Sequence, residues 1–286
     1  MDKWSFRRPR GACRNSGRAV TALPVDWFEV LDVDPEDVAR VGHSLAEYAL
    51  EYETPDPTQF EEGVVERELM LATTLADAAT LLVLIDQGVA SEILARGARL
   101  YERAGAPEAW TLGLASNGFW QPSRDERDGS MAPPPSEPIS SLAALYYDQE
   151  VELGNLHTPW RAAGALRDNA GLGWSLAGVP ASMFEQFVAY ARGSRVEAMA
   201  GALDRIVERA DEPIRFAQEL DRWRWQRFLA DVPLIDLELV ALGHVASRVD
   251  GGLIEQVRNR DLSPARVALL VGMRLSEAPP PRDHLG

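Results

Sequence analysis

A histidine and two glutamates stand four residues apart in the first quarter of the chain. They are His43, Glu47 and Glu51, and this spacing places all three on one face of a helix. An imidazole and two carboxylates are ligands that divalent metals accept. Di-metal carboxylate bundles, however, use a Glu-x-x-His pair on each of two helices, and that pair is absent from the sequence. We interpret the three residues as a solvated acidic face, and keep a metal site as the alternative.

A second group of residues with binding potential lies on a helix predicted over residues 213–231. Its apolar residues cover more than half of the circumference, which indicates a helix packed between two layers or one that presents aromatic residues to a partner. Charged residues fall inside or between these apolar sectors, and they can pair along the helix. Trp and Arg are also typical anchors of protein interfaces. A structural ion-pair network is one interpretation, and a partner-binding patch is the other; the patch comprises Asp221, Trp223, Arg224, Trp225 and Arg227.

Motifs for nucleophilic or nucleotide chemistry are missing from the sequence. There is no Gly-x-Ser-x-Gly, no P-loop and no Gly-x-Gly-x-x-Gly after a strand. The single cysteine, Cys13, lies in a polar basic segment. We therefore predict no catalytic residue and no cofactor, although an enzyme that uses unmarked histidines and carboxylates would leave no motif.

Prolines mark the expected starts of the helices that position these residues. A proline suits the first turn of a helix, because the amide hydrogen that it lacks would have no partner there. An Asp, Ser or Thr just before it can accept a hydrogen bond from a free amide of that turn. Five times a capping or acidic residue stands directly before a proline that leads an apolar-periodic stretch: Asp34-Pro35, Asp56-Pro57, Thr158-Pro159, Glu212-Pro213 and Ser263-Pro264.

The apolar spacing between these signals predicts helices throughout and no sheet. In the helix 35–53 the residues expected to face the core are Val38, Val41, Leu45, Tyr48 and Tyr52. Gly88 is the expected stop of the third helix. We predict an all-α fold, either an irregular multi-helix bundle or a short α-solenoid, with about 11–13 helices. The expected ranges are 25–33, 35–53, 57–87, 91–104, 107–115, 139–153, 159–169, 180–192, 194–209, 213–231, 233–249, 253–260 and 264–276.

Composition divides the chain into five parts. Residues 1–22 are polar, basic and aperiodic and are predicted to be a disordered tail. A helical half over residues 23–120 is followed by a Pro-rich loop or linker, 121–138, and by a second helical half, 139–276. Residues 277–286 are expected to form a mobile tail. The sequence leaves open whether the two halves are separate domains.

Charge is distributed unevenly along this chain. The net charge is −15, yet residues 1–22 carry six basic residues and one acidic residue, which leaves about −20 for the remainder. An acidic body repels nucleic acid and anionic membranes and suits a basic partner. The longest apolar run, 81–85, is far too short to span a membrane. We expect a cytoplasmic protein, with nucleic-acid binding only through residues 1–22.

Three function hypotheses follow. Arginine supplies 28 of the 29 basic residues, a bias typical of a GC-rich bacterial genome. The leading hypothesis is a bacterial helical protein–protein interaction protein, such as an adaptor, an immunity or antitoxin-like factor, or a phage- or defence-associated accessory. It would bind another protein, possibly a basic one, through the Trp/Arg helix face or the acidic surface. The second is an all-helical enzyme or metal protein, and the third a nucleic-acid-binding accessory.

Overall fold

The chain folds into helices, as predicted. The computed structural model describes residues 24–53, 64–106, 108–116, 179, 181–225, 235–258 and 260–275, together with Leu142 and Leu145. Within this described part there are ten helices and no strand. They are α1 (Val25–Leu31), α2 (Pro35–Glu53), α3 (Val64–Leu82), α4 (Gln87–Arg103), α5 (Glu108–Ala115), α7 (Ala181–Arg192), α8 (Val196–Trp225), α9 (Leu237–Val249), α10 (Leu253–Arg258) and α11 (Pro264–Leu275).

The centre of the fold is an antiparallel pair formed by α9 and α11. Residues 237–246 and 264–273 are buried on every side of their helices. The two helices touch through their backbones, because a Cβ added at Gly243 would lie 2.0 Å from the carbonyl oxygen of Leu269. A Cβ added at Gly272 would likewise lie 2.0 Å from the carbonyl oxygen of Val240. Glycine is required at this crossing because any side chain would collide with the opposite main chain.

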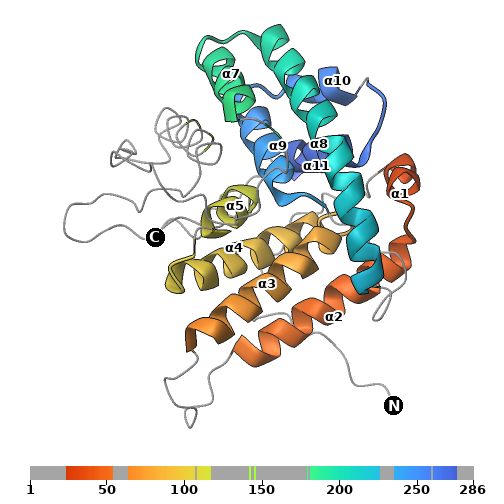
Figure 1. The fold of residues 1–286 in the computed structure, drawn as a ribbon, viewed down its shortest axis with the longest axis vertical. Helices are drawn as coiled ribbons and strands as arrows, with labels where there is room; N and C mark the ends of the chain where they lie inside the picture. The colour runs from red at the N-terminus through yellow and green to blue at the C-terminus, as the bar shows by residue number, and fades with distance from the viewer. Residues whose placement is uncertain are drawn as a thin grey trace, which may run out of the picture.

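The remaining helices flank this central pair in two groups (Figure 1). On one side α2, α3, α4 and α5 pack in sequence order, with α5 against α9. On the other side α7, α8 and α10 pack together, and α8 and α10 contact α11. Contacts such as α5 with α9 and α1 with α11 join segments far apart in the chain. A solenoid repeat contacts only its neighbours, so the fold is the irregular bundle rather than the solenoid.

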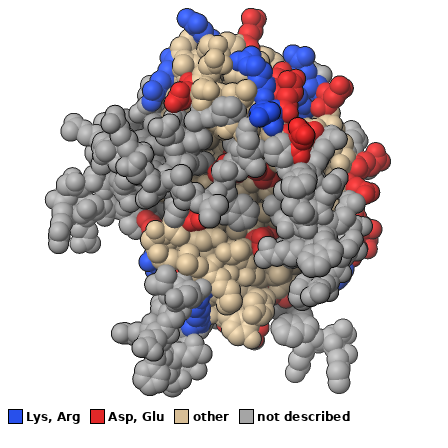
Figure 2. Space-filling view, viewed as in Figure 1, with Lys and Arg blue, Asp and Glu red and all other residues tan. Residues whose placement is uncertain are grey.

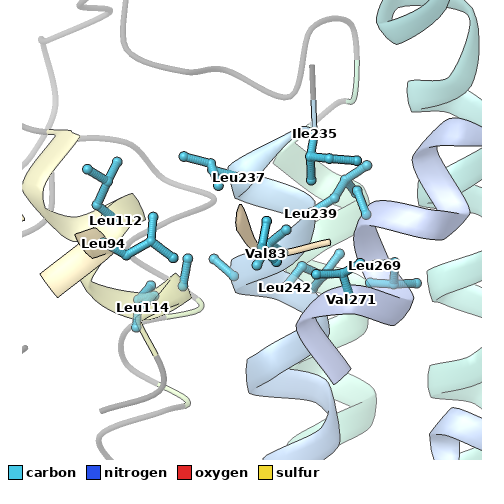
Figure 3. Packing of buried hydrophobic residues seen from close by; sticks show 14 of the residues in the cluster. Val83, Leu94, Leu112, Leu114, Ile235, Leu237, Leu239, Leu242, Leu269 and Val271 are labelled. Carbon is cyan, nitrogen blue, oxygen red and sulfur yellow. The ribbon is translucent and has the colours of Figure 1, made fainter. Parts of the chain in front are cut away.

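Buried apolar residues of both chain halves form one continuous cluster. Figure 3 shows Leu94, Leu112 and Leu114 facing α9, whose other side meets Leu269 and Val271 of α11. The boundaries proposed around residues 121–138 lie outside the described residues, so the division into halves stays a prediction.

Polar contacts orient the outer helices on the central pair. The guanidinium of Arg274 on α11 lies 5.0 Å from the ring centroid of Trp27 on α1. Arg266, which is buried, donates from Nη1 to Oδ1 of Asp204 on α8 at 2.7 Å. Since a buried guanidinium is costly without a partner, this pair fixes where α11 meets α8.

Two proline-led helix starts are confirmed. The Asp34 side chain accepts a hydrogen bond from the Glu36 amide at 2.7 Å, at the start of α2. Ser263 Oγ accepts one from the Arg266 amide at 3.3 Å, at the start of α11. The pairs at residues 56–57 and 158–159, the loop 121–138, both terminal tails and most of the helices expected at 139–169 lie outside the described residues. Leu142 and Leu145 are helical and buried.

The helix boundary predicted at Glu212-Pro213 is wrong. One helix, α8, spans Val196–Trp225 and passes without a break through the boundary expected between the helices 194–209 and 213–231. An interior proline costs a helix about 3 kcal/mol. Ala210 and Ile214 are both buried on either side of Pro213, and this packing outweighs the local penalty.

Two other boundaries shift because an aspartate caps the helix. The Asp86 side chain accepts from the Val89 amide at 3.1 Å, so α3 ends at Leu82 and Gly88 lies inside the first turn of α4 instead of stopping α3. Asp236 accepts from the amides of Glu238 and Leu239 at 2.9 and 3.0 Å, and α9 therefore begins at Leu237 rather than at Pro233.

Candidate functional site

Two tyrosines stand in solvent on the outer face of α2. The exposed fractions of Tyr48 and Tyr52 are 47% and 51%. Their ring centroids lie 4.7 Å apart with a tilt of 45° between the planes, an arrangement that a four-residue spacing on a helix favours. The contact holds both rings together, so they form one aromatic surface on this helix.

The sequence prediction that these tyrosines face the core is wrong. The buried side of α2 carries small residues instead, namely Gly42, Ala46 and Ala49. A Cβ added at Gly42 would lie 2.8 Å from Leu82 Cγ, so α2 approaches α3 too closely for a large side chain. Glycine and alanine therefore form the buried face in this part of α2, and the two tyrosines lie on its exposed face. The spacing of these small residues is the sequence signal that would have revealed the exposed face.

Acidic side chains border the tyrosines on the same helix. Glu47 and Glu51 are both exposed. At about 100° per residue the four positions 47, 51, 48 and 52 cover an arc of about 140°. A partner that approaches this arc meets two carboxylates on one side and two phenol rings on the other.

The neighbouring helix α3 carries an exposed apolar residue at the same end of the helix pair. The Arg67 side chain donates to the carbonyl oxygen of Tyr52, and Leu82, at the far end of α3, faces Gly42. These two contacts set α2 and α3 antiparallel. Met70 follows Arg67 by one turn and is 50% exposed, so it lies at the same end of the helix pair as the tyrosines. We call Glu47, Tyr48, Glu51, Tyr52 and Met70 the α2 outer face.

The first two helices are strongly acidic as a whole. Residues 24–53 contain nine acidic residues and one basic residue, Arg40, which bonds Asp37 at 2.6 Å. This short segment therefore has a net charge of −8. Figure 2 shows mainly acidic side chains along the edge of the molecule that carries α1, whereas both signs mix over α7, α8 and α10. Six of the nine acidic residues precede residue 38, and the other three, Glu47, Glu51 and Glu53, lie at the end of α2 that carries the tyrosines.

The candidate metal ligands share this part of α2. His43, half-buried, and the exposed Glu47 and Glu51 lie along one side of the helix, as the spacing predicted. Among the residues that the structure describes, no group of three or more His, Cys, Asp and Glu side chains is placed to hold a metal ion.

The Trp/Arg patch falls at the C-terminal end of α8. Residues 221–225 are helical there, which places Asp221, Trp223, Arg224 and Trp225 on one element. Their side chains, and Arg227 altogether, lie outside the described residues, so this patch stays a prediction.

A buried histidine joins the two chain halves. His244 on α9 is inaccessible to solvent, and its Nδ1 lies 2.6 Å from the carbonyl oxygen of Leu114 in the last turn of α5. A carbonyl only accepts, so the neutral ring carries its hydrogen on Nδ1. Burial lowers the pKa of His244 to about 4, against a smaller opposing effect of this hydrogen bond. The ring therefore satisfies a helix-end carbonyl and stays uncharged at neutral pH.

Asp236, at the start of the same helix, is the other perturbed group. Burial raises its pKa to about 6, although hydrogen bonds from the Leu239 and Glu238 amides act in the opposite direction. Its surface is only partly buried, so water screens it more than it screens His244. A perturbed pKa is common at active sites, but structural networks produce it too, and both groups here act as helix caps.

Comparisons with known proteins returned no match, whether against family models, curated proteins or solved structures. Within the described residues, no helix is long and apolar enough to cross a membrane.

Proposed function

We propose that this chain is a helical protein–protein interaction protein and that it binds its partner through the α2 outer face. The observation that carries the proposal is the exposed Tyr48–Tyr52 pair on an acidic helix. Tyrosines are rigid, amphipathic anchors that bury a large area at low entropic cost. Because the folded helix already holds the two rings in contact, less side-chain entropy is lost when they become part of an interface.

The chemistry of the α2 outer face defines the partner. The exposed Glu47 and Glu51, within a segment of net charge −8, favour a basic surface and accelerate its approach. The adjoining phenol rings and the Met70 thioether favour an apolar or guanidinium group, since arginine binds over aromatic faces. The expected partner is a protein that presents arginine or lysine beside an apolar side chain.

The fold supports this role by giving the surface a rigid base. Positions 46 and 49 on the opposite side of α2 are buried alanines, and α2 packs against α3. Because this contact does not involve the tyrosines, they can be changed without opening the core. This separation allows binding and stability to be measured independently.

A matched pair of charge reversals tests the proposal. One variant carries Glu47→Arg and Glu51→Arg, and the control carries Glu185→Arg and Glu208→Arg, which are exposed glutamates on α7 and α8. Each is used as bait in an extract of the source cells, followed by quantitative mass spectrometry. We expect a stoichiometric partner with the parent and the control, and at least roughly tenfold less of it with the α2 variant, as expected for the loss of interface hot spots. Equal recovery with all three baits would refute the α2 surface.

A further inference from the structure

The chain contains a segment whose chemistry matches that of the expected partner. We propose that residues 1–22 of the same chain bind the α2 outer face and compete there with the partner. This inference deepens the proposed function, because it concerns the regulation of the same surface.

Charge complementarity is the first argument. Residues 1–22 have a net charge of +5, and the next folded segment, residues 24–53, has a net charge of −8. The rest of the chain is acidic as well, so no other long stretch offers comparable positive charge. Opposite charges of this size, joined by the chain itself, attract strongly at physiological ionic strength over distances of about 8 Å.

The pattern of side chains in the segment also matches the α2 outer face. Trp4 and Phe6 precede the Arg7-Arg8 pair. Two aromatic rings beside two guanidinium groups complement two phenol rings beside two carboxylates. Aromatic pairs add stabilisation beyond their buried area, and arginine can stack on a tyrosine while it pairs with a glutamate.

Chain length permits the contact. Trp4 lies twenty residues before Pro24, where the described structure begins. An extended chain reaches about 3.3–3.6 Å per residue, or roughly 65–70 Å over this distance. The 19-residue helix α2 is only about 28 Å long. The segment therefore reaches every part of the α2 outer face, and such a tether gives an effective concentration in the millimolar range.

Competition follows from this tethering. If the segment occupies the surface nine-tenths of the time, the apparent affinity for the partner falls about tenfold. A partner, or an event that removes charge from the segment, would then release the surface. In this arrangement the basic residues 1–22 inhibit binding of the partner by occupying the acidic helix α2.

The chain provides a natural probe, because Lys3 is its only lysine. A water-soluble carbodiimide activates a carboxylate; the Lys3 amine attacks it, an amide forms, and the carbodiimide leaves as a urea that has taken up the elements of water. Peptide mapping of the full-length protein then identifies the carboxylate that Lys3 reaches. We expect a link from Lys3 to Glu47 or Glu51 within a monomer, independent of protein concentration and suppressed by 0.5 M salt.

The controls use the same charge reversals. Glu47→Arg with Glu51→Arg should shift the remaining links away from α2, and Glu185→Arg with Glu208→Arg should leave the Lys3 links to α2 unchanged; Lys3→Arg should abolish them. Links spread evenly over acidic residues of α7, α8 and α10, or none at all, would overturn the inference. Links found only in covalent dimers would show a second copy as the occupant and would also overturn it.

The two proposals fail in different ways. A partner captured through α2 without any link from Lys3 leaves the proposed function standing and removes the intramolecular arm. A Lys3 link to α2 without a captured partner supports the arm and removes the proposed binding function.

Discussion

His244 on α9 and Asp236 at its N-terminus give the free energy of unfolding opposite dependences on pH. The pKa of His244 falls from 6.5 to about 4 on folding, so its contribution to the free energy of unfolding is complete above pH 6.5 and is lost as the pH falls toward 4. The pKa of Asp236 rises from 3.8 to about 6, so its contribution is complete below pH 3.8 and is lost as the pH rises toward 6. Each effect is at most about 3 kcal/mol, and the partly exposed Asp236 gives the smaller one.

Two asparagine substitutions separate these contributions. Asn caps a helix about as well as Asp, and its amide can donate to a carbonyl as the Nδ1–H of histidine does. Relative to the parent, His244→Asn should gain stability as the pH falls from 6.5 to 4. Asp236→Asn should gain stability over the parent as the pH rises from 4 to 6. Urea unfolding at pH 4, 5, 6 and 7 measures both differences, and two flat profiles would contradict the assigned burial.

At the scale of elements, the crossing of α9 and α11 depends on the absence of a side chain at Gly243 and at Gly272. Gly243→Ala drives a methyl group into the Leu269 carbonyl, where the distance would be 2.0 Å. We expect a loss of about 3 kcal/mol or more in the free energy of unfolding, because neither backbone can move without disturbing the core.

Gly201→Ala is the matched control for this crossing. Position 201 also lies inside a helix, α8, but an added Cβ would meet only the tip of Arg205, at 3.7 Å. Alanine there should raise the free energy of unfolding by about 0.5–1 kcal/mol. Denaturant midpoints compare the two, and equal effects would show that the helices do not touch as described.

A second pair of variants tests the continuity of α8. Pro35 opens α2, where proline is suited, whereas Pro213 lies inside α8. Pro213→Ala should stabilise the protein by about 1–3 kcal/mol through the restored backbone hydrogen bond, and Pro35→Ala should change stability by less than about 1 kcal/mol. A loss of stability from Pro213→Ala would indicate a helix boundary there after all.

The sequence predicts a helix boundary well when local interactions determine it, and poorly when packing against distant segments does. The cap at Asp34 and the start at Pro35 are local, and the sequence predicts α2 to its last residue. The continuity at Pro213 depends on burial of Ala210 and Ile214 by distant segments, which no local pattern reveals. The exposure of Tyr48 follows from the close approach of α3 at Gly42, and the small residues at positions 42, 46 and 49 are the local pattern that indicates it.

At the scale of the whole molecule, the shared hydrophobic cluster makes the two chain halves interdependent. Leu112 on α5 is fully buried in the cluster that also contains α9 and α11. Leu112→Ala should therefore lower the midpoint of a single thermal transition, by roughly 4–12 °C for a loss of 2–4 kcal/mol. Calorimetry that resolved two transitions, with only one shifted, would show independent halves.

The proposed function requires that a protein partner binds the α2 outer face. The most direct measurement replaces Tyr48 or Tyr52, one at a time, with the photoreactive residue p-benzoylphenylalanine, and the exposed Glu185 on α7 in the control. Irradiation of the source cells should join one protein to the chain at positions 48 and 52 and not at position 185. The same adduct at position 185, or no adduct at either tyrosine, would contradict the claim.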